Sequence, residues 1–239
     1  MQKQFSVTAF LFTDIEGSTR LWEEEPERMR AALARHDELA RGVVASNHGE
    51  IVKTTGDGIH AVFADPLDAV RAALAFQQAL HAPDATGGLP LAVRCGVHAG
   101  VAESRDSDFF GSAVNRAARI MAAAHGGQIL VSQTTIDLAG ERLPRDVTLR
   151  DLGLVRLRDL AHPERVYQVA HPSLRHDFPA LRSLESTPNN LPQQVTSFVG
   201  REREAVELAS LCRRARLRDC QVDPFRRRAN RLQYSDGEE

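Results

Sequence analysis

The chain contains very little lysine: of its 30 basic residues only Lys3 and Lys53 are lysine, and the others are arginine. It also lacks any apolar run close to the roughly 20 residues that a membrane-spanning helix needs. Its first residues lack the apolar core of a signal peptide, and its 3 cysteines form neither a metal-ligand spacing nor an even-numbered disulfide set. We therefore expect a cytoplasmic protein that does not enter a membrane.

An excess of charge of one sign is lacking as well. A formal net charge of −2 gives no overall attraction to nucleic acid or to an anionic membrane surface, so neither partner is expected. With 239 residues, 42% of them hydrophobic, the chain is long enough for one core domain and an appendage. The composition predicts a domain over residues 1–171, a proline-rich linker over 172–192, and a largely disordered, arginine-rich tail over 193–239.

Hydrophobic periodicity in residues 1–171 predicts strands and helices in mixed order. Apolar alternation predicts strands, and apolar residues at helical spacing predict helices that begin at proline or serine and end near glycine. A strand from 91 to 98 is expected to turn at Gly100 into a partner strand. The mixed order predicts an α+β fold with helices packed on a mostly antiparallel sheet. The predicted elements are strands at 6–13, 91–98, 128–131, 149–157 and 166–170, a hairpin at 51–63, and helices at 26–48, 65–80 and 111–124.

The hairpin at 51–63 is the most informative stretch, because its two apolar strands meet at a polar Gly-Asp-Gly tip. Gly56 and Gly58 give the backbone freedom to present the Asp57 carboxylate at an open turn. Asp14 ends an earlier apolar strand, and antiparallel pairing of the two strands would bring both carboxylates together. Converging carboxylates suit a hard divalent cation such as Mg²⁺. Two unrelated turn aspartates are the alternative that spacing alone leaves open.

A second candidate group lies on the helix predicted over 111–124. Asn115 and Arg119 are one helical turn apart and share a face. An arginine fork beside an amide suits a phosphate and a sugar hydroxyl, although an ordinary polar helix face has the same pattern. Asp108 lies on the loop before this helix, where a lone aspartate is usually solvated.

Three segments contain these residues in a fixed order: Phe-Thr-Asp14-Ile-Glu-Gly-Ser-Thr, Val-Lys53-Thr-Thr-Gly-Asp57-Gly and Asp108-Phe-Phe-Gly-Ser-Ala-Val-Asn115-Arg-Ala-Ala-Arg119. Together they resemble the catalytic domain of class III adenylyl and guanylyl cyclases, and most closely the soluble bacterial branch. The resemblance covers residues 5–171. It implies a ferredoxin-like core that dimerises head to tail, with active sites at the interface between two chains.

The resemblance also implies a metal site. Asp14 and Asp57, with the carbonyl of Ile15 as a further ligand, would hold two divalent ions, Mg²⁺ or Mn²⁺, in each active site. The family usually adds a phosphate-binding lysine late in the domain, where this chain has Arg156 and Arg158. We rank Arg158 ahead of Arg156 for that role, although arginine and lysine are not equivalent phosphate ligands.

The remaining implied roles concern the nucleotide. Lys53 and Asp108 would read the purine, Asn115 would orient the ribose, and Arg119 would stabilise the charged transition state at the α-phosphate. Lys53 can only donate and Asp108 can only accept, which matches adenine and opposes guanine. The chain is therefore predicted to be an adenylyl cyclase that acts on ATP as a homodimer. The alternatives are a catalytically weak regulatory module with a cyclase fold and, with less support, a guanylyl cyclase.

The tail carries a second resemblance. The segment Asn189-Asn190-Leu-Pro-Gln-Gln-Val-Thr-Ser-Phe-Val-Gly-Arg-Glu-Arg-Glu204 is similar to the entry of signalling ATPase domains that follow such cyclases in larger transcriptional regulators. A phosphate loop of those domains needs a lysine, and no lysine follows Lys53. We therefore interpret the tail as a truncated remnant of such a domain.

Overall fold

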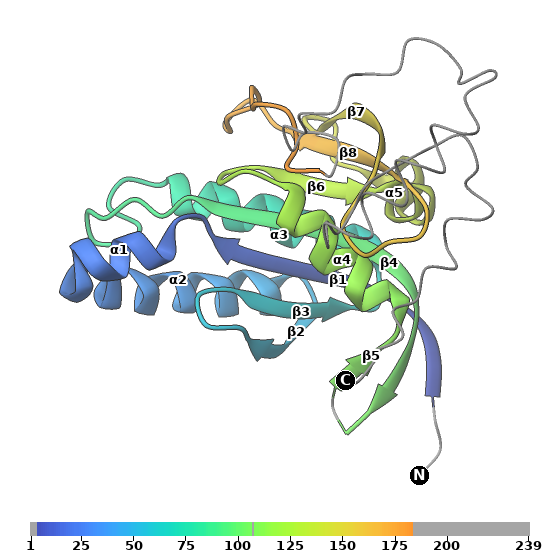
Figure 1. Cartoon of the computed structure of the whole chain (residues 1–239), viewed down its shortest axis with the longest axis horizontal. Helices are drawn as coiled ribbons and strands as arrows, with labels where there is room; N and C mark the ends of the chain where they lie inside the picture. The colour runs from blue at the N-terminus through green and yellow to red at the C-terminus, as the bar shows by residue number, and fades with distance from the viewer. Residues whose placement is uncertain (1–3, 107, 184–239) are drawn as a thin grey trace, which may run out of the picture. The chain divides into compact units, whose positions relative to one another are not determined.

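The computed structural model describes residues 4–106 and 108–183, which belong to one compact unit (Figure 1). Its centre is an eight-stranded sheet in the order β2-β3-β1-β4-β6-β8-β7, with β5 paired to β4. The pairing of β4 with β6 is parallel, and the other pairings are antiparallel. The predicted α+β fold with a mostly antiparallel sheet is confirmed. The strands are β1 (Gln4–Ile15), β2 (Gly49–Thr54), β3 (Ile59–Phe63), β4 (Val93–Arg105), β5 (Asp108–Phe110), β6 (Ile129–Ser132), β7 (Thr148–Val155) and β8 (Glu164–Ala170).

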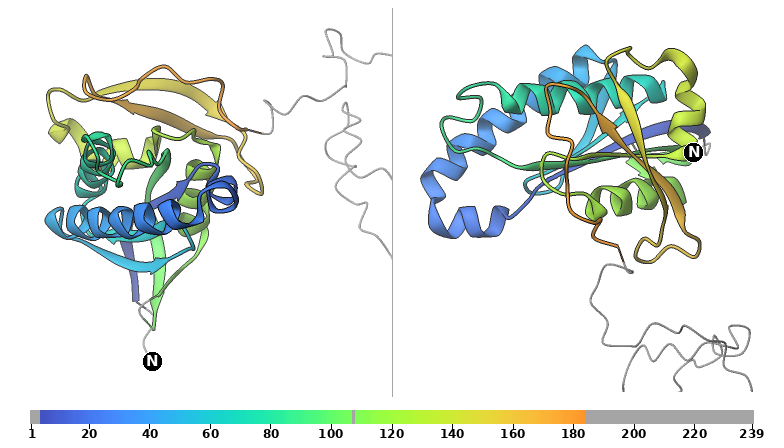
Figure 2. Two further views of the ribbon diagram at one scale, coloured as in Figure 1. Left: turned by 90° about the vertical axis from the view of Figure 1, so that its left-hand side faces the viewer. Right: turned by 90° about the horizontal axis from the view of Figure 1, so that it is seen from above.

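Helices cover both faces of the sheet, with α2 and α3 together on one face and α4 on the other (Figure 2). Successive side chains of β1 point to opposite faces of the sheet and so belong to two parts of the core. Leu11 packs in the cluster with α2 and α3, while Phe10 and Phe12 pack with α4. No helix in the described part of the chain is long and apolar enough to cross a membrane. The helices are α1 (Ser18–Glu24), α2 (Pro26–Ser46), α3 (Pro66–His81), α4 (Ser112–Ala123), α5 (Gln133–Ala139) and the 3₁₀ turn η1 (Gly140–Arg142).

The turn predicted at Gly100 is wrong, because β4 continues without interruption to Arg105. A Cβ atom on Gly100 would lie only 3.0 Å from the Cβ of Ala113, so the glycine allows α4 to approach the sheet. The chain turns later, and β5 folds back on the end of β4. This β4–β5 ribbon and the start of β1 extend beyond the helices (Figure 1).

The segment after β8 packs on the domain, although its composition predicts a linker from residue 172. Leu174 is buried in the main core. The Arg182 N–H donates to the Ala123 carbonyl at 3.0 Å, and Gln168 Nε2 donates to the His176 carbonyl at 2.7 Å. These contacts are made by single residues that do not recur at a regular spacing in the sequence, so hydrophobic periodicity cannot predict them. The rest of the predicted linker and the tail lie outside the described residues.

Candidate active site

The tip of the β2–β3 hairpin lies against the end of β1. The Ile59 N–H donates to Thr13 Oγ1 at 3.1 Å. A Cβ atom on Gly58 would lie 2.0 Å from the Thr13 carbonyl oxygen and 3.2 Å from the Asp14 Cα, so only glycine permits this approach. Gly56 has a φ of +73°, which supplies the predicted freedom at the tip. The residue that follows Asp57 therefore lies directly against the end of β1 that carries Asp14.

The donor set at this junction fits a hard divalent cation. Among the described residues the Asp57 Oδ2 atom is buried and has no hydrogen-bond partner, and such an atom is costly unless something binds it. The described residues contain no cluster of three or more His, Cys, Asp or Glu side chains placed to hold a metal. One chain thus offers the two carboxylates with a backbone carbonyl such as that of Ile15. This is enough for Mg²⁺ or Mn²⁺, which keep coordination positions for phosphate oxygens and water.

Arg94 is a functional candidate that the sequence reasoning missed. The β1–β4 register places it opposite Asp14, and its Nη2 and Nε atoms lie 2.6 and 2.8 Å from Asp14 Oδ2. Its Nη1 donates to the carbonyl of Ala122 near the end of α4 at 3.4 Å. The only sequence signal is one arginine inside an apolar strand, and its partner is visible only once the strand register is known.

Lys53 and Asp108 meet although they are 55 positions apart in the chain. The lysine Nζ donates to Oδ2 at 2.7 Å and to Oδ1 at 3.0 Å, and the Phe109 N–H donates to Oδ1 at 2.8 Å. The hydrogen bond from Lys53, with that from Phe109, lowers the pKa of the Asp108 carboxyl. Asp108 is therefore a carboxylate acceptor and Lys53 a cationic donor, and both side chains are partly exposed.

Asn115 and Arg119 both lie on α4, one turn apart as predicted, and Asn115 is exposed. Arg119 Nη2 contacts Asp159 Oδ2 at 2.6 Å. Asp159 lies with Arg158 at the tip of a turn that the Leu160 N–H closes on the Leu157 carbonyl. Arg158 is exposed there, so the predicted phosphate ligand and the partner of Arg119 are neighbours on one turn.

Residues 1–170 match the family of the adenylate and guanylate cyclase catalytic domain. The chain belongs to this family. An uncharacterized protein of Mycobacterium tuberculosis is 40% identical over 195 residues, which cover 80% of this chain and 66% of the length of that relative. The solved structure of an adenylate cyclase from Trypanosoma brucei in its monomeric state has a TM-score of 0.67 at 28% identity and covers 74% of this chain and 92% of that chain. The adenylyl cyclase CyaB from P. aeruginosa has a TM-score of 0.63 at 25% identity and covers 75% and 100%.

Several of the charged candidates of this cyclase domain form ion pairs inside the free chain. Lys53 pairs with Asp108, Arg94 with Asp14, and Arg119 with Asp159. The Lys53–Asp108 and Arg119–Asp159 pairs are the more exposed ones, and surface ion pairs are typically worth 0 to about 1 kcal/mol, so exchanging their partners costs little; the Arg94–Asp14 side chains are only 20% and 26% exposed. A nucleotide with its metal ions carries both charges and can replace the internal partners.

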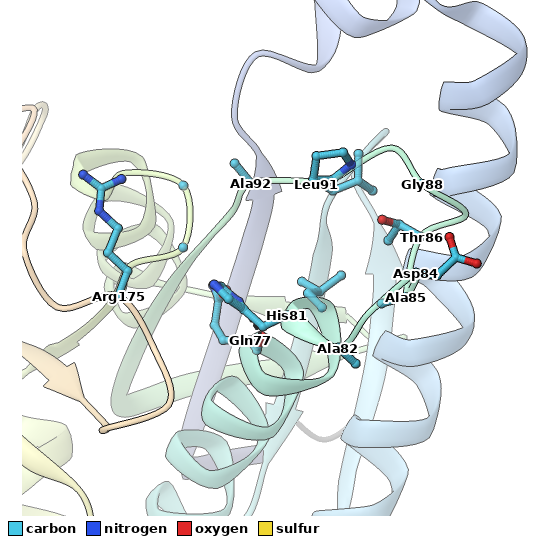
Figure 3. A pocket seen from close by; sticks show the side chains of 14 residues that line it. Gln77, His81, Ala82, Asp84, Ala85, Thr86, Gly88, Leu91, Ala92 and Arg175 are labelled. Atoms are coloured by element: carbon cyan, nitrogen blue, oxygen red, sulfur yellow. Dashed lines mark hydrogen bonds between the residues drawn. The ribbon is translucent and has the colours of Figure 1, made fainter.

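A cavity of about 630 Å³ lies elsewhere in the cyclase domain (Figure 3). It is lined by the end of α3 with Gln77 and His81, by the loop that carries Thr86, and by Arg175. None of the predicted site residues lines it.

Proposed function

We propose that this cyclase domain converts ATP into 3′,5′-cyclic AMP and pyrophosphate, as a homodimer with active sites at the interface. The observation that carries the proposal is the close approach of Gly58, the neighbour of Asp57, to the end of β1 that carries Asp14, together with the Asp57 Oδ2 atom, which is buried without a partner among the described residues. The two carboxylates would hold two Mg²⁺ or Mn²⁺ ions, which supply the charge that acidifies the ribose 3′-hydroxyl and neutralises the triphosphate.

The other residues position the nucleotide and stabilise charge. Asn115 orients the ribose so that its 3′-oxygen lies in line with the leaving pyrophosphate. Arg119 stabilises the charge that develops at the α-phosphate. Arg158 binds the phosphates from the neighbouring turn, where an arginine fork can contact two oxygens at once.

Selection of ATP follows from the Lys53–Asp108 pair. Lys53 donates to adenine N1, and Asp108 accepts from the adenine 6-amino group. Guanine has a donor at N1 and an acceptor at position 6, so donor would face donor and acceptor would face acceptor. Mismatches of buried polar groups discriminate strongly between substrates, and ATP is favoured over GTP.

Two features support a site shared between chains. The Lys53–Asp108 pair lies just before the start of α4, whereas Arg94 and Asp14 lie at its end, where Arg94 contacts Ala122. A helix of 12 residues is about 18 Å long, and only one ribose separates the base of a nucleotide from its α-phosphate. In addition, Val7 and Val101 lie opposite each other on the projecting strands and are 52% and 59% exposed, as expected of residues that a second chain covers.

The test is product formation from ATP and from GTP with Mn²⁺ or Mg²⁺, over a dilution series of the protein. We expect cyclic AMP, a specific activity that falls on dilution, and at least about a hundredfold preference for ATP. Binding of ATP without product at any concentration would favour the regulatory module, and a preference for GTP would overturn the roles given to Lys53 and Asp108.

Asp159→Asn should raise kcat/KM for ATP about two- to fivefold, because it frees Arg119 from a surface ion pair of modest strength. Asparagine suits the backbone of this position, whose φ is +61°. The control is Glu164→Gln, which removes another carboxylate that pairs with an α4 arginine, Arg116, and leaves Arg119 untouched. Steady-state kinetics of both variants decide, and an equal effect of Glu164→Gln would mean that general loosening of α4 is responsible.

A further inference from the structure

His60 is a buried polar side chain whose presence the fold does not explain. Its exposed fraction is 0%, and among the described residues neither ring nitrogen has a hydrogen-bond partner. Burial of an unpaired polar group lowers the stability of the folded state. A phenyl ring of similar shape would avoid this cost, so an unpaired histidine here calls for a functional explanation.

The position of His60 connects it to the purine-reading pair. The strand registers place it between Lys53 on β2 and Phe12 on β1. Residues directly opposite each other on antiparallel strands share a face, so the three side chains form a row across the sheet. The imidazole stacks on Phe12, with ring centroids 4.3 Å apart and planes at 16°. His60 thus lies beside the lysine that binds Asp108.

The ring is neutral at ordinary pH. The pKa of His60 is lowered to about 4, chiefly by burial and also by the nearby charge of Lys53, while the charge of Asp108 opposes the shift. A neutral imidazole has one N–H donor and one nitrogen that only accepts. The His60 nitrogen that only accepts has no partner among the described residues and lies near the Lys53 ammonium, so it can accept a hydrogen bond from that lysine.

We propose that His60 is a positioning residue for purine recognition, whose ring nitrogen accepts a hydrogen bond from Lys53 once Asp108 turns to the base. In the free chain Lys53 uses its donors on the two carboxylate oxygens of Asp108. When ATP binds, Asp108 accepts from the adenine amino group and Lys53 donates to N1. The Lys53 ammonium carries three donors. One of them loses its acceptor when Asp108 turns to the base, and the His60 ring nitrogen accepts from it instead. This inference rests on the proposed function.

The test compares His60→Phe with His60→Gln. Phenylalanine keeps the ring but removes both nitrogens, so we expect Tm to rise by about 2–4 °C. We expect the KM for ATP to rise about tenfold with kcat little changed, and the preference for ATP over GTP to fall by a similar factor, since a hydrogen bond to a charged group is lost. Glutamine restores an acceptor, so it should recover most of this preference although it is the less stable of the two variants.

The chain offers a matched control in His36 on α2. It is also 0% exposed, it lies edge-on to Phe76 with ring centroids 5.2 Å apart, and its Nε2 has no partner among the described residues, although its Nδ1 lies 3.0 Å from Asp37 Oδ1. His36→Phe should therefore change Tm without changing the KM for ATP or the ATP preference. If His60 has only a structural role, the ATP preference should rise and fall with Tm across His60→Phe, His60→Gln and His36→Phe. That result would overturn the proposal.

Binding measurements separate this inference from the proposed function. Calorimetry with 3′-deoxy-ATP and 3′-deoxy-GTP, which lack the reacting hydroxyl, gives affinities that do not depend on turnover. A wild type that makes no cyclic AMP but prefers 3′-deoxy-ATP, with the preference lost in His60→Phe, would sink the enzyme assignment and uphold the role of His60. Unchanged affinities in His60→Phe would overturn the role of His60 alone, and a wild type that binds neither nucleotide would overturn both.

Discussion

Asp57→Asn should reduce cyclic AMP formation by about a thousandfold or more and leave the domain folded. Metal-ion charge at the reacting groups supplies several kcal/mol of transition-state stabilisation, and about 4 kcal/mol corresponds to a thousandfold in rate. The amide is a poorer ligand for a hard cation than the carboxylate. Because Asp57 Oδ2 has no hydrogen-bond partner among the described residues, the exchange breaks no contact of that atom in the free chain.

Three measurements on this variant belong together: cyclic AMP formation, thermal unfolding, and the shift of Tm by Mn²⁺. The wild type should gain stability with Mn²⁺ and ATP, since a ligand that binds only the folded state raises Tm by mass action, and Asp57→Asn should lose most of that gain. The control is Asp137→Asn on the exposed side of α5, which removes a carboxylate of the same size that accepts from Gln133. Activity within tenfold of the wild type in Asp57→Asn would show that this carboxylate holds no catalytic metal.

The sequence predicts a structural feature well when the residues that form it are close together along the chain, and poorly when they are far apart. The hairpin tip around Asp57 and the pairing of Asn115 with Arg119 on one helix face are local, so turn chemistry and helical spacing predict them. The role of Gly100, in contrast, depends on a residue of another element and cannot be predicted locally. A glycine in a strand signals either a turn or a close approach, and only the position of Ala113 on α4 decides between them.

The partners of the charged residues could not be predicted from the residues alone. Arg94 faces Asp14 across 80 positions and Asp159 reaches Arg119 across 40, so each pair depends on strand order and on the conformation of one loop. His60 looks like an ordinary residue of an apolar strand until the register places it beside Lys53. The family resemblance predicts which residues would act on the nucleotide, whereas the strand register and the loop conformations show which side chains those residues contact in the free chain.

Two inactive variants should restore each other when they are mixed. Asp57→Ala removes a metal ligand, and Arg119→Ala removes the group that acts at the α-phosphate. In a head-to-tail dimer each site takes its aspartates from one chain and its arginine from the other. A mixed dimer therefore has one site with both substitutions and one site with neither. Random exchange of equal amounts should give about a quarter of the wild-type activity, because half of the dimers are mixed and each has one intact site.

The decisive control mixes two variants of the same half-site, Asp14→Ala and Asp57→Ala. Each site of that mixed dimer lacks one aspartate, so activity should stay at the level of the single variants. The two mixtures contain the same amounts of protein and should form mixed dimers to the same extent, which pull-down with two different affinity tags measures. Recovery confined to the first mixture requires a site built from two chains. If mixed dimers form and neither mixture recovers, the aspartates and Arg119 act within one chain, and the open surface formed by Asp14, Asp57 and α4 must bind the whole nucleotide by itself.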